Sequence, residues 1–207
     1  HQSDTIYHYL DNVNIRTSRL VVMHNWSALI GSNTKLEFRN LFDQVGQNET
    51  TVRTGQNMEE NFDMTNYAFH YQQRTIYSGQ LRGTHDMHND RMQMDWTLGY
   101  GRAIGEEPDF RRAETVRDMG ASDAPYQVVI PPSASTRDAG RFYSNLDEST
   151  YTAKLDLSQK VGKRDASITA TVRAGMVAER KSRDFSARWM SFKTANTEQF
   201  DQTLAKL

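Results

Sequence analysis

The stretch YAFHYQQRTIYSGQLRGTH, residues 67–85, decides the fold because its side chains alternate with a period of two. Successive side chains of a β-strand point to opposite faces, whereas a helix repeats its apolar positions every three or four residues. The alternation continues well beyond the usual strand length of about 5–6 residues. One parity carries most of the rings and aliphatic side chains, namely Tyr67, Phe69, Tyr71, Tyr77 and Leu81. The other parity is mostly polar and contains His70, Gln72, Arg74, Gln80 and Arg82.

A second alternating segment follows after a short polar turn at residues 86–90. Its apolar parity is Met92, Met94, Trp96, Leu98 and Tyr100, and its polar parity includes Gln93, Asp95 and Thr97. Two alternating segments joined by a turn rich in Asn and Asp are typical of a β-hairpin. We therefore expect an antiparallel pair of long strands.

The pattern recurs in two further hairpins. Residues 151–161 and 167–176 alternate on either side of a turn at 162–165, with Tyr151, Leu155 and Leu157 in the apolar parity. Residues 19–30 and 35–45 flank a turn at 31–34 and alternate less regularly. The sequence thus predicts an all-β protein with about six or seven strands in an antiparallel up-and-down meander.

The connections alternate in length along the chain. Short turns are expected at 31–34, 86–90 and 162–165, and long polar connections near 46–64 and 102–148. Outer-membrane barrels have short turns on the periplasmic side and long loops on the extracellular side. This asymmetry favours part of the wall of a transmembrane β-barrel over a soluble sandwich or propeller.

The positions of the charged residues predict which parity faces lipid. Arg74, Arg82, Lys154, Asp156 and Arg173 all fall on the polar parity. An Arg or Lys on the lipid face at mid-membrane costs about 2–4 kcal/mol, so the uncharged parity should be the one that meets lipid. The expected lipid-facing belt is Tyr67, Phe69, Tyr71, Tyr77, Leu81, Met92, Met94, Trp96, Leu98, Tyr100, Tyr151, Leu155 and Leu157.

Composition excludes several classes of protein. The 207 residues are 37% hydrophobic with a net charge of −1, and no window approaches the roughly 20 apolar residues of a membrane helix. The balanced charge argues against a nucleic-acid partner, which would require a cluster of Lys and Arg. Without cysteine, neither a disulfide framework nor a thiolate metal site can form.

The amino-acid sequences of several segments resemble one protein family. LEFRNLFDQVGQNETTVRTG (36–55), RTIYSGQLRGTH (74–85) and MDWTLGYGRA (94–103) look like barrel strands of TonB-dependent receptors, in the branch with an N-terminal carboxypeptidase-regulatory-like domain. EEPDFRR (106–112), NLDESTYTAKLDLSQKV (145–161) and KSRDFSARWMSF (181–192) extend the resemblance to nearly the whole chain.

The resemblance implies a 22-stranded outer-membrane barrel filled by a plug, which imports a scarce nutrient with energy relayed by TonB. Residues 1–207 would then be a fragment of the barrel domain, without the plug, the N-terminal domain or the C-terminal strand. The expected partners are TonB through the missing region, a surface lipoprotein lid, the nutrient and outer-membrane lipid. No cofactor is expected.

Two polar motifs are candidate sites. Glu106, Glu107, Asp109, Arg111 and Arg112 lie in the longest predicted loop, where ligand contacts could form, although a solvated salt-linked loop is the simpler interpretation. The run from His85 to His88 offers two histidines without a third fixed ligand, which favours turn residues over a metal site. No spacing indicates paired catalytic carboxylates or a nucleophile with its base, so we expect no enzyme.

Three functions are compatible with these features to different degrees. Transport is favoured by the alternation of apolar and polar side chains together with the resemblance to TonB-dependent receptors. The alternative is a soluble, secreted β-domain that binds glycan or protein, which the low overall hydrophobicity and the tyrosine-rich strands would suit. A hydrolase borne on a barrel would need an acid and a histidine above the rim, for which His8 and His24 are the strand histidines to consider besides His70.

Overall fold

A computed structural model of the chain describes residues 5–87, 91–130, 139–162 and 170–193. The described part is all-β and forms one antiparallel up-and-down sheet that does not close. The long strands are β1 (Tyr7–Ile30), β2 (Thr34–Asn57), β3 (Phe62–Met87), β4 (Met92–Ala113), β7 (Ala139–Val161) and β8 (Ala170–Ser191). Two short strands, β5 (Thr115–Asp118) and β6 (Gln127–Val128), complete the described set.

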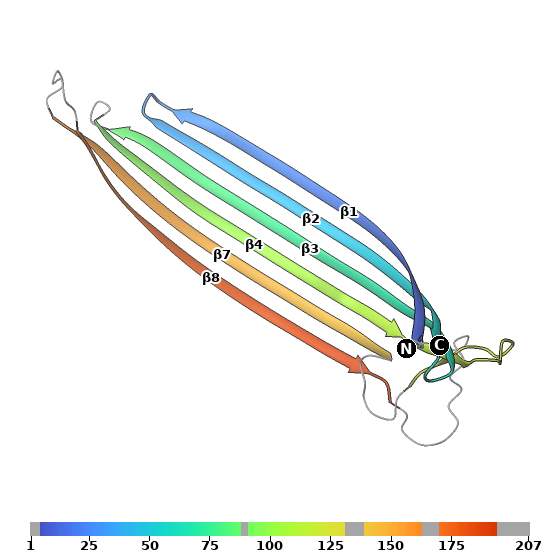
Figure 1. Ribbon diagram of the computed structural model, residues 1–207. Coiled ribbons are helices and arrows are strands. Elements are labelled where there is room, and N and C mark those ends of the chain that lie inside the picture. Colours follow the sequence, from blue (N-terminus) through green and yellow to red (C-terminus); the bar gives the residue numbers. More distant parts are fainter. Residues whose placement is uncertain (1–4, 88–90, 131–138, 163–169, 194–207) are drawn as a thin grey trace.

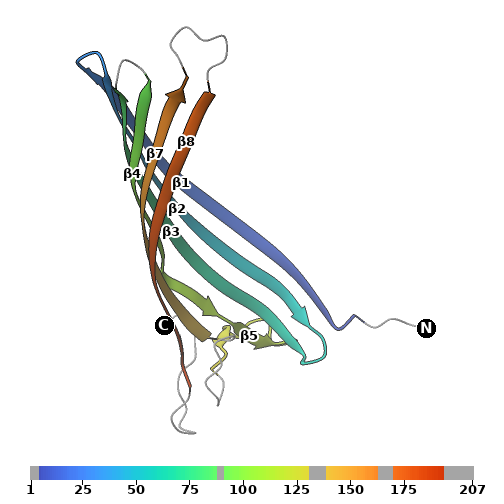
Figure 2. The ribbon, with the colours of Figure 1, turned by 90° about the vertical axis from the view of Figure 1, so that its left-hand side faces the viewer.

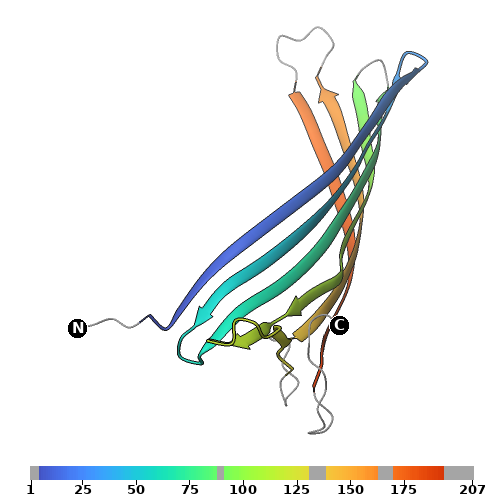
Figure 3. The ribbon, with the colours of Figure 1, turned by 90° about the vertical axis from the view of Figure 1, so that its right-hand side faces the viewer.

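The long strands lie side by side in the order β1-β2-β3-β4-β7-β8, so each one pairs with its neighbour along the chain (Figure 1). The strands curve and twist together, and the two side views show a bent, open sheet (Figures 2 and 3). Strand β5 pairs with β3 and β6, near the end of the sheet where the chain leaves β4. Within the described residues, β1 and β8 are the edge strands of this sheet.

The strand ends that flank the three predicted short turns all lie at one end of the sheet, at the upper left of Figure 1, and residues 88–90 and 163–169 at these turns lie outside the described residues. The first turn needs only residues 31–33, and Gly31 adopts a φ of 64°, which glycine tolerates without strain. Two longer connections were predicted at the other end, near 46–64 and 102–148, and both predictions were wrong in extent. Residues 102–113 belong to β4 and residues 139–148 belong to β7. Residues 46–57 belong to β2, so the connection between β2 and β3 is only residues 58–61.

The long strands continue because their backbone pairing does not depend on an apolar face. Residues 46–57 pair without interruption with β1 on one side and β3 on the other. Their polar side chains pair across strands, as in the bidentate contact of Arg53 with Asp11, where Nε lies 2.7 Å from Oδ1. With polar side chains on both faces, the segment lacks the alternation that indicates a half-buried strand.

The sheet is a single layer with almost no core. Among the described residues, the buried apolar side chains are Met64, Val128 and Ala139, and Thr115 is the buried polar one. Met64 lies on β3, Thr115 on β5 and Val128 on β6, and β5 pairs with both β3 and β6. Ala139 is the first residue of β7. Both faces of the long strands are consequently open. No helix that could span a membrane occurs among the described residues.

Candidate functional site

One face of the sheet carries a continuous apolar band that starts at the short turns. The register places residues of even number on β1, β2, β4 and β8 on the same face as residues of odd number on β3 and β7. On each strand the band runs from the turn to the last residue of this face before Ser18, Gln44, Thr75, Arg102, Ser149 or Arg180, and it includes a few polar residues. The apolar band so defined covers 20–30 on β1, 34–42 on β2, 77–87 on β3, 92–100 on β4, 151–161 on β7 and 170–178 on β8.

The two faces differ sharply in charge over these same ranges. On the apolar face the described residues include no Asp, Glu, Lys or Arg, and the polar exceptions besides tyrosine are His24, Thr34, Asn40, His85 and Gln159. The opposite face, here called the polar face, holds Lys35, Glu37, Arg39, Arg82, Asp86, Asp95, Lys154, Asp156, Lys160 and Arg173. The predicted separation of charge by parity is therefore present in the sheet.

The height of the apolar band matches a membrane. Each strand contributes nine or eleven residues to it, counted from the ranges above, and a transmembrane β-strand needs about 9–11. Many apolar side chains of the band are exposed in this single layer, among them Leu98 at 53% and Met176 at 67%. An apolar surface of this extent is typical of contact with lipid or another protein rather than with water.

The band also crosses the strands at a slant. Following paired residues across the sheet, Ile30, at the turn-side end of the band on β1, is level with Leu157 on β7. The band on β7 extends four residues closer to its turn, to Val161. Four residues span about 13 Å along a strand, and four strand spacings span about 19 Å, which gives a tilt of about 35°. At the other edge, Leu20 on β1 is level with Asp184 on β8 when paired residues are followed across the sheet. The band on β8 ends six residues closer to the turn, at Ala178. This edge gives about 40°.

Both edges therefore slope in the same direction and by nearly the same angle. Strands of outer-membrane barrels are tilted by about 35–45° from the barrel axis. A band that is level with a membrane plane would have this slope across the strands. The turn-side edge follows the hairpin turns and the other edge follows side-chain type, so neither edge uses any information about lipid.

Tyrosines mark the edge of the band that lies away from the turns. The rings of Tyr77 and Tyr100 are 6.1 Å apart, and those of Tyr100 and Tyr151 are 5.1 Å apart. Just past them Arg102 Nη2 lies 2.6 Å from Asp147 Oδ2, and hydrogen bonding from Arg102 lowers the pKa of the Asp147 carboxyl. Apolar side chains thus give way to rings with a polar tip and then to charges, as at a membrane interface.

All thirteen residues of the predicted lipid-facing belt lie on the apolar face. Ten of them lie within the band: Tyr77, Leu81, Met92, Met94, Trp96, Leu98, Tyr100, Tyr151, Leu155 and Leu157. Tyr67, Phe69 and Tyr71 lie six to ten residues further from the turns than Tyr77, which is about 20–33 Å along the strand. These three residues lie on the same face as the band but beyond its end on β3.

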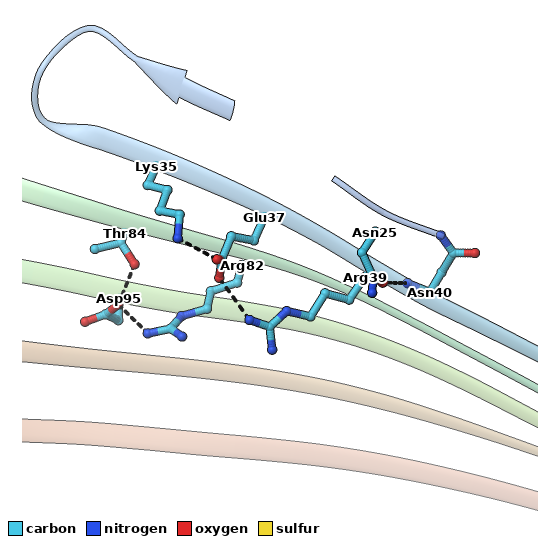
Figure 4. Close-up of polar contacts among 8 residues, drawn as sticks. All are labelled: Asn25, Lys35, Glu37, Arg39, Asn40, Arg82, Thr84 and Asp95. Carbon is cyan, nitrogen blue, oxygen red and sulfur yellow. Dashed lines mark hydrogen bonds and ion pairs between the residues drawn. The ribbon is translucent and has the colours of Figure 1, made fainter. Parts of the chain in front are cut away.

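Ion pairs cover the polar face at the level of the band (Figure 4). Asp95 accepts hydrogen bonds from Arg82 Nη2 at 3.0 Å and from Thr84 Oγ1 at 2.7 Å. On β2, Glu37 lies 2.7 Å from Lys35 Nζ and 3.4 Å from Arg39 Nη2. Exposed pairs of this kind contribute little to stability, so their main effect is to make the surface compatible with water.

A shallow polar groove of about 410 Å³ runs across this face from β2 to β8. Asp95 and Asp156 occupy paired positions on β4 and β7 within it. Each carboxylate has its own cation, with Arg82 at 3.0 Å from Asp95 and Lys154 at 2.6 Å from Asp156. The cations offset the repulsion that two opposed carboxylates would otherwise create. Such a surface can line an aqueous passage.

The five candidate ligand contacts lie on a strand, which corrects the prediction that they belong to a loop. Glu106, Glu107, Asp109, Arg111 and Arg112 are all part of β4. Pairing shifts by one residue on both sides of β4, between Phe69 and Gln73 on β3 and between Glu107 and Phe110 on β4. The segment is thus a β-bulge, and it contains Pro108, which has no N–H to donate to a ladder.

The bulge distributes the five candidates over both faces. Glu107 Oε2 lies 2.8 Å from His70 Nε2 on the polar face, and the guanidinium of Arg112 lies 4.8 Å from the centre of the Phe110 ring. Asp109 accepts a hydrogen bond from Arg141 Nε at 2.8 Å and also contacts Arg111. These contacts, that of Arg141 foremost, lower the pKa of the Asp109 carboxyl. The five do not converge on one point.

The bulge also brings together rings that the sequence analysis did not connect. The His70 and Phe110 rings are 4.6 Å apart, Phe110 lies 6.5 Å from Trp189, and Trp189 lies 4.5 Å from Phe142. Beside them is a groove of about 350 Å³ on the polar face, lined in part by Gln47, Gln72, Arg74, Glu107 and Phe185. Pro108 within an alternating segment was the available signal, since proline in a strand often marks a bulge.

His85 does not form a metal site with its neighbours among the described residues. Trp96 Nε1 donates to His85 Nε2 at 2.9 Å, and His85 Nδ1 lies 3.1 Å from Thr34 Oγ1. Both ring nitrogens are thereby engaged. His88 lies outside the described residues, and the described part of the chain holds no cluster of three metal-ligating side chains.

Comparison with known proteins does not assign the chain to a family. No protein-family model matches the chain, and no curated protein matches it.

Proposed function

We propose that this chain forms part of the wall of an outer-membrane transporter of the TonB-dependent receptor type, which imports a nutrient across the cell outer membrane. The observation that carries the proposal is the apolar band. It has the height of a bilayer core, slopes as a tilted barrel strand requires, and lies opposite a face that bears charges at the same level.

The rest of each strand extends beyond the membrane in this proposal. Strands of 22–26 residues are about 75–85 Å long, whereas the band takes only nine or eleven residues of each. The short turns then face the periplasm, and the bulge of β4 with its aromatic groove faces the cell exterior. Nutrient contacts are expected there, on the polar face that would line the passage.

Further strands would be required to complete the wall. The described sheet leaves an edge at β1 and another at β8, and unpaired edges within lipid are not tolerated. The chain would therefore belong to a longer barrel that also holds the plug and contacts TonB. A lipoprotein lid at the outer surface is the further partner that this type of transporter would take.

Cysteine labelling in intact cells tests the orientation, since residues 1–207 contain no cysteine and any cysteine elsewhere in the full-length protein is first replaced by serine. Glu59→Cys in the connection from β2 to β3 should react with a membrane-impermeant maleimide in intact cells. Ser32→Cys in the first short turn should react only after the outer membrane is made permeable. Equal reaction of both in the soluble fraction would instead support a secreted β-domain that binds glycan or protein.

Transport itself needs a second test. A strain without the full-length protein should lose uptake of a scarce nutrient, and a strain without TonB should show the same loss. Uptake that persists without TonB would contradict the transporter type even if the labelling places the strands in the membrane.

A further inference from the structure

We infer that β4, β7 and β8 form a binding site for a membrane lipid with an anionic phosphate headgroup, on the apolar face at the edge marked by the tyrosines. This inference rests on the proposed function, because it requires the apolar band to lie in a bilayer. Two separate features meet at this place, a set of hydrogen-bond donors and an apolar hollow directly beneath it.

The donors come from three adjacent strands. Arg102 on β4 pairs with Ser149 on β7, and Ser149 pairs with Ser182 on β8. Arg180 on β8 pairs with Tyr151, one position closer to the band. Because paired residues have Cβ atoms about 4.5–5.5 Å apart, these side chains can reach one group the size of a phosphate.

The two arginines at this edge lie nearer the band than the two aspartates on the same face, Asp147 and Asp184, which are paired across β7 and β8. Arg102 neutralises Asp147 with Nε at 3.1 Å and Nη2 at 2.6 Å. Within the described part of the chain, Arg180 forms no ion pair. Guanidinium groups bind phosphate with two parallel hydrogen bonds, so an exposed Arg180 beside two serine hydroxyls favours an anionic oxygen ligand.

An apolar hollow of about 400 Å³ lies on the same face, one register position nearer the turns. It is lined by Trp96, Leu98, Ala153, Lys154, Leu155, Met176 and Ala178. Ala153 and Ala178 are paired across β7 and β8, and their small side chains leave the space that the larger residues surround. The lining is almost wholly apolar, so its occupant is a hydrocarbon chain rather than a polar solute.

A lipid joins the two features in one molecule. A free phosphate would use the donors but leave the hollow empty, and an uncharged hydrocarbon would fill the hollow but not meet Arg180. An acyl chain in the hollow places its headgroup at the level of Arg102, Arg180 and the serines, where membrane phosphates lie.

Trp96 reports on the hollow directly. In the full-length protein with Trp26→Phe and Trp189→Phe, and with any tryptophan outside these residues replaced in the same way, Trp96 is the remaining fluorophore. The protein is placed in vesicles of phosphatidylcholine that contain either phosphatidylglycerol or phosphatidylcholine with brominated acyl chains at equal mole fraction. Bromine quenches tryptophan only on contact, so quenching measures the occupancy of the hollow.

We expect brominated phosphatidylglycerol to occupy the hollow about five-fold more strongly than brominated phosphatidylcholine, which is the effect of about one cation near an anionic lipid. Arg180→Gln should remove this preference, whereas Arg173→Gln on the polar face of the same strand should keep it. Ala178→Phe should fill the hollow and reduce quenching, whereas Ala174→Phe, outside the hollow, should not.

Equal quenching by the two brominated lipids in the protein with Arg180 intact would overturn the lipid site while leaving the band in the membrane. Quenching by neither lipid would show that Trp96 does not face acyl chains. That second result would overturn the proposed function, and the lipid site with it.

Discussion

The indole of Trp96 on β4 lies over Gly83 on β3, at paired positions of the sheet. A Cβ atom at residue 83 would overlap the indole atoms Cε2 and Nε1. The ring is held there by its hydrogen bond to His85 Nε2, at 2.9 Å. Glycine at 83 thus allows a large ring to lie flat on the apolar band, and the ring covers a position that has no side chain of its own.

Gly83→Ala should therefore displace the indole and destabilise the sheet by about 1–3 kcal/mol, the usual cost of adding volume to a packed site. The free energy of unfolding in vesicles measures this loss. Gly99→Ala is the matched control on β4, because its Cβ would meet Thr152 Cβ at 3.5 Å, an ordinary contact. Equal stability of the two variants would contradict the packing of Trp96 over Gly83.

A charge in the middle of the apolar band should be costly only on one face. Leu155→Arg places a guanidinium at the centre of the band on β7, so we expect a loss of about 2–4 kcal/mol in vesicles. Thr152→Arg on the polar face of the same strand pairs with Gly99 and Glu179 and should cost no more than about 1 kcal/mol. Similar losses for the two variants would mean that both faces meet the same solvent.

The ion pairs of Asp109 predict how acid affects the bulge. Its carboxyl has a lowered pKa, chiefly from the hydrogen bond of Arg141, so the native state holds fewer protons than the unfolded state just below the usual carboxyl range. The stability from this group is present above pH of about 4 and is lost as the pH falls through the lowered pKa. Asp109→Asn should reduce stability at neutral pH and flatten the decline in acid.

Unfolding of the full-length protein and of Asp109→Asn at pH 7 and pH 3 measures this difference. Asp184→Asn serves as the control, because Asp184 forms no ion pair among the described residues. A decline in acid that is as steep in Asp109→Asn as in the natural protein would assign the acid response to other groups.

The aromatic cluster at the bulge should order the outer part of β4 without affecting the membrane part. Phe110→Ala removes the ring contacts with His70 and Trp189, each worth about 0.5–1.5 kcal/mol. We expect faster amide hydrogen exchange at residues 107–113 and unchanged exchange at 94–98. Uniform acceleration along β4 would show that the strand opens as one unit.

The sequence predicted the fold most accurately where the two faces meet different surroundings. Residues 67–85 and 92–100 alternate because one face of each is apolar and the other bears charges such as Arg82 and Asp95. The antiparallel pairing within the three hairpins and the shared face of the thirteen belt residues followed from that contrast. Parity alone was enough, since a strand repeats every two residues.

The same reasoning failed where both faces are polar. Residues 46–57 pair fully with β1 and β3 yet carry side chains such as Gln47 and Asn48 on either face, so no alternation indicates the strand. Residues 106–112 failed for a second reason. The bulge at Pro108 exchanges the two parities, which places Phe110 and Arg112 on the polar face and hides the link between His70, Phe110 and Trp189.

The most direct test of the membrane band is a scan of solvent access along β7. Cysteine is introduced singly at each of residues 151–160 of the full-length protein and labelled with a nitroxide, whose collisions with oxygen and with a water-soluble nickel complex are measured in vesicles. Oxygen concentrates in the acyl region and nickel in water. We expect high oxygen and low nickel access at 151, 153, 155, 157 and 159, and the reverse at the positions between them. High nickel access at every position would contradict the band.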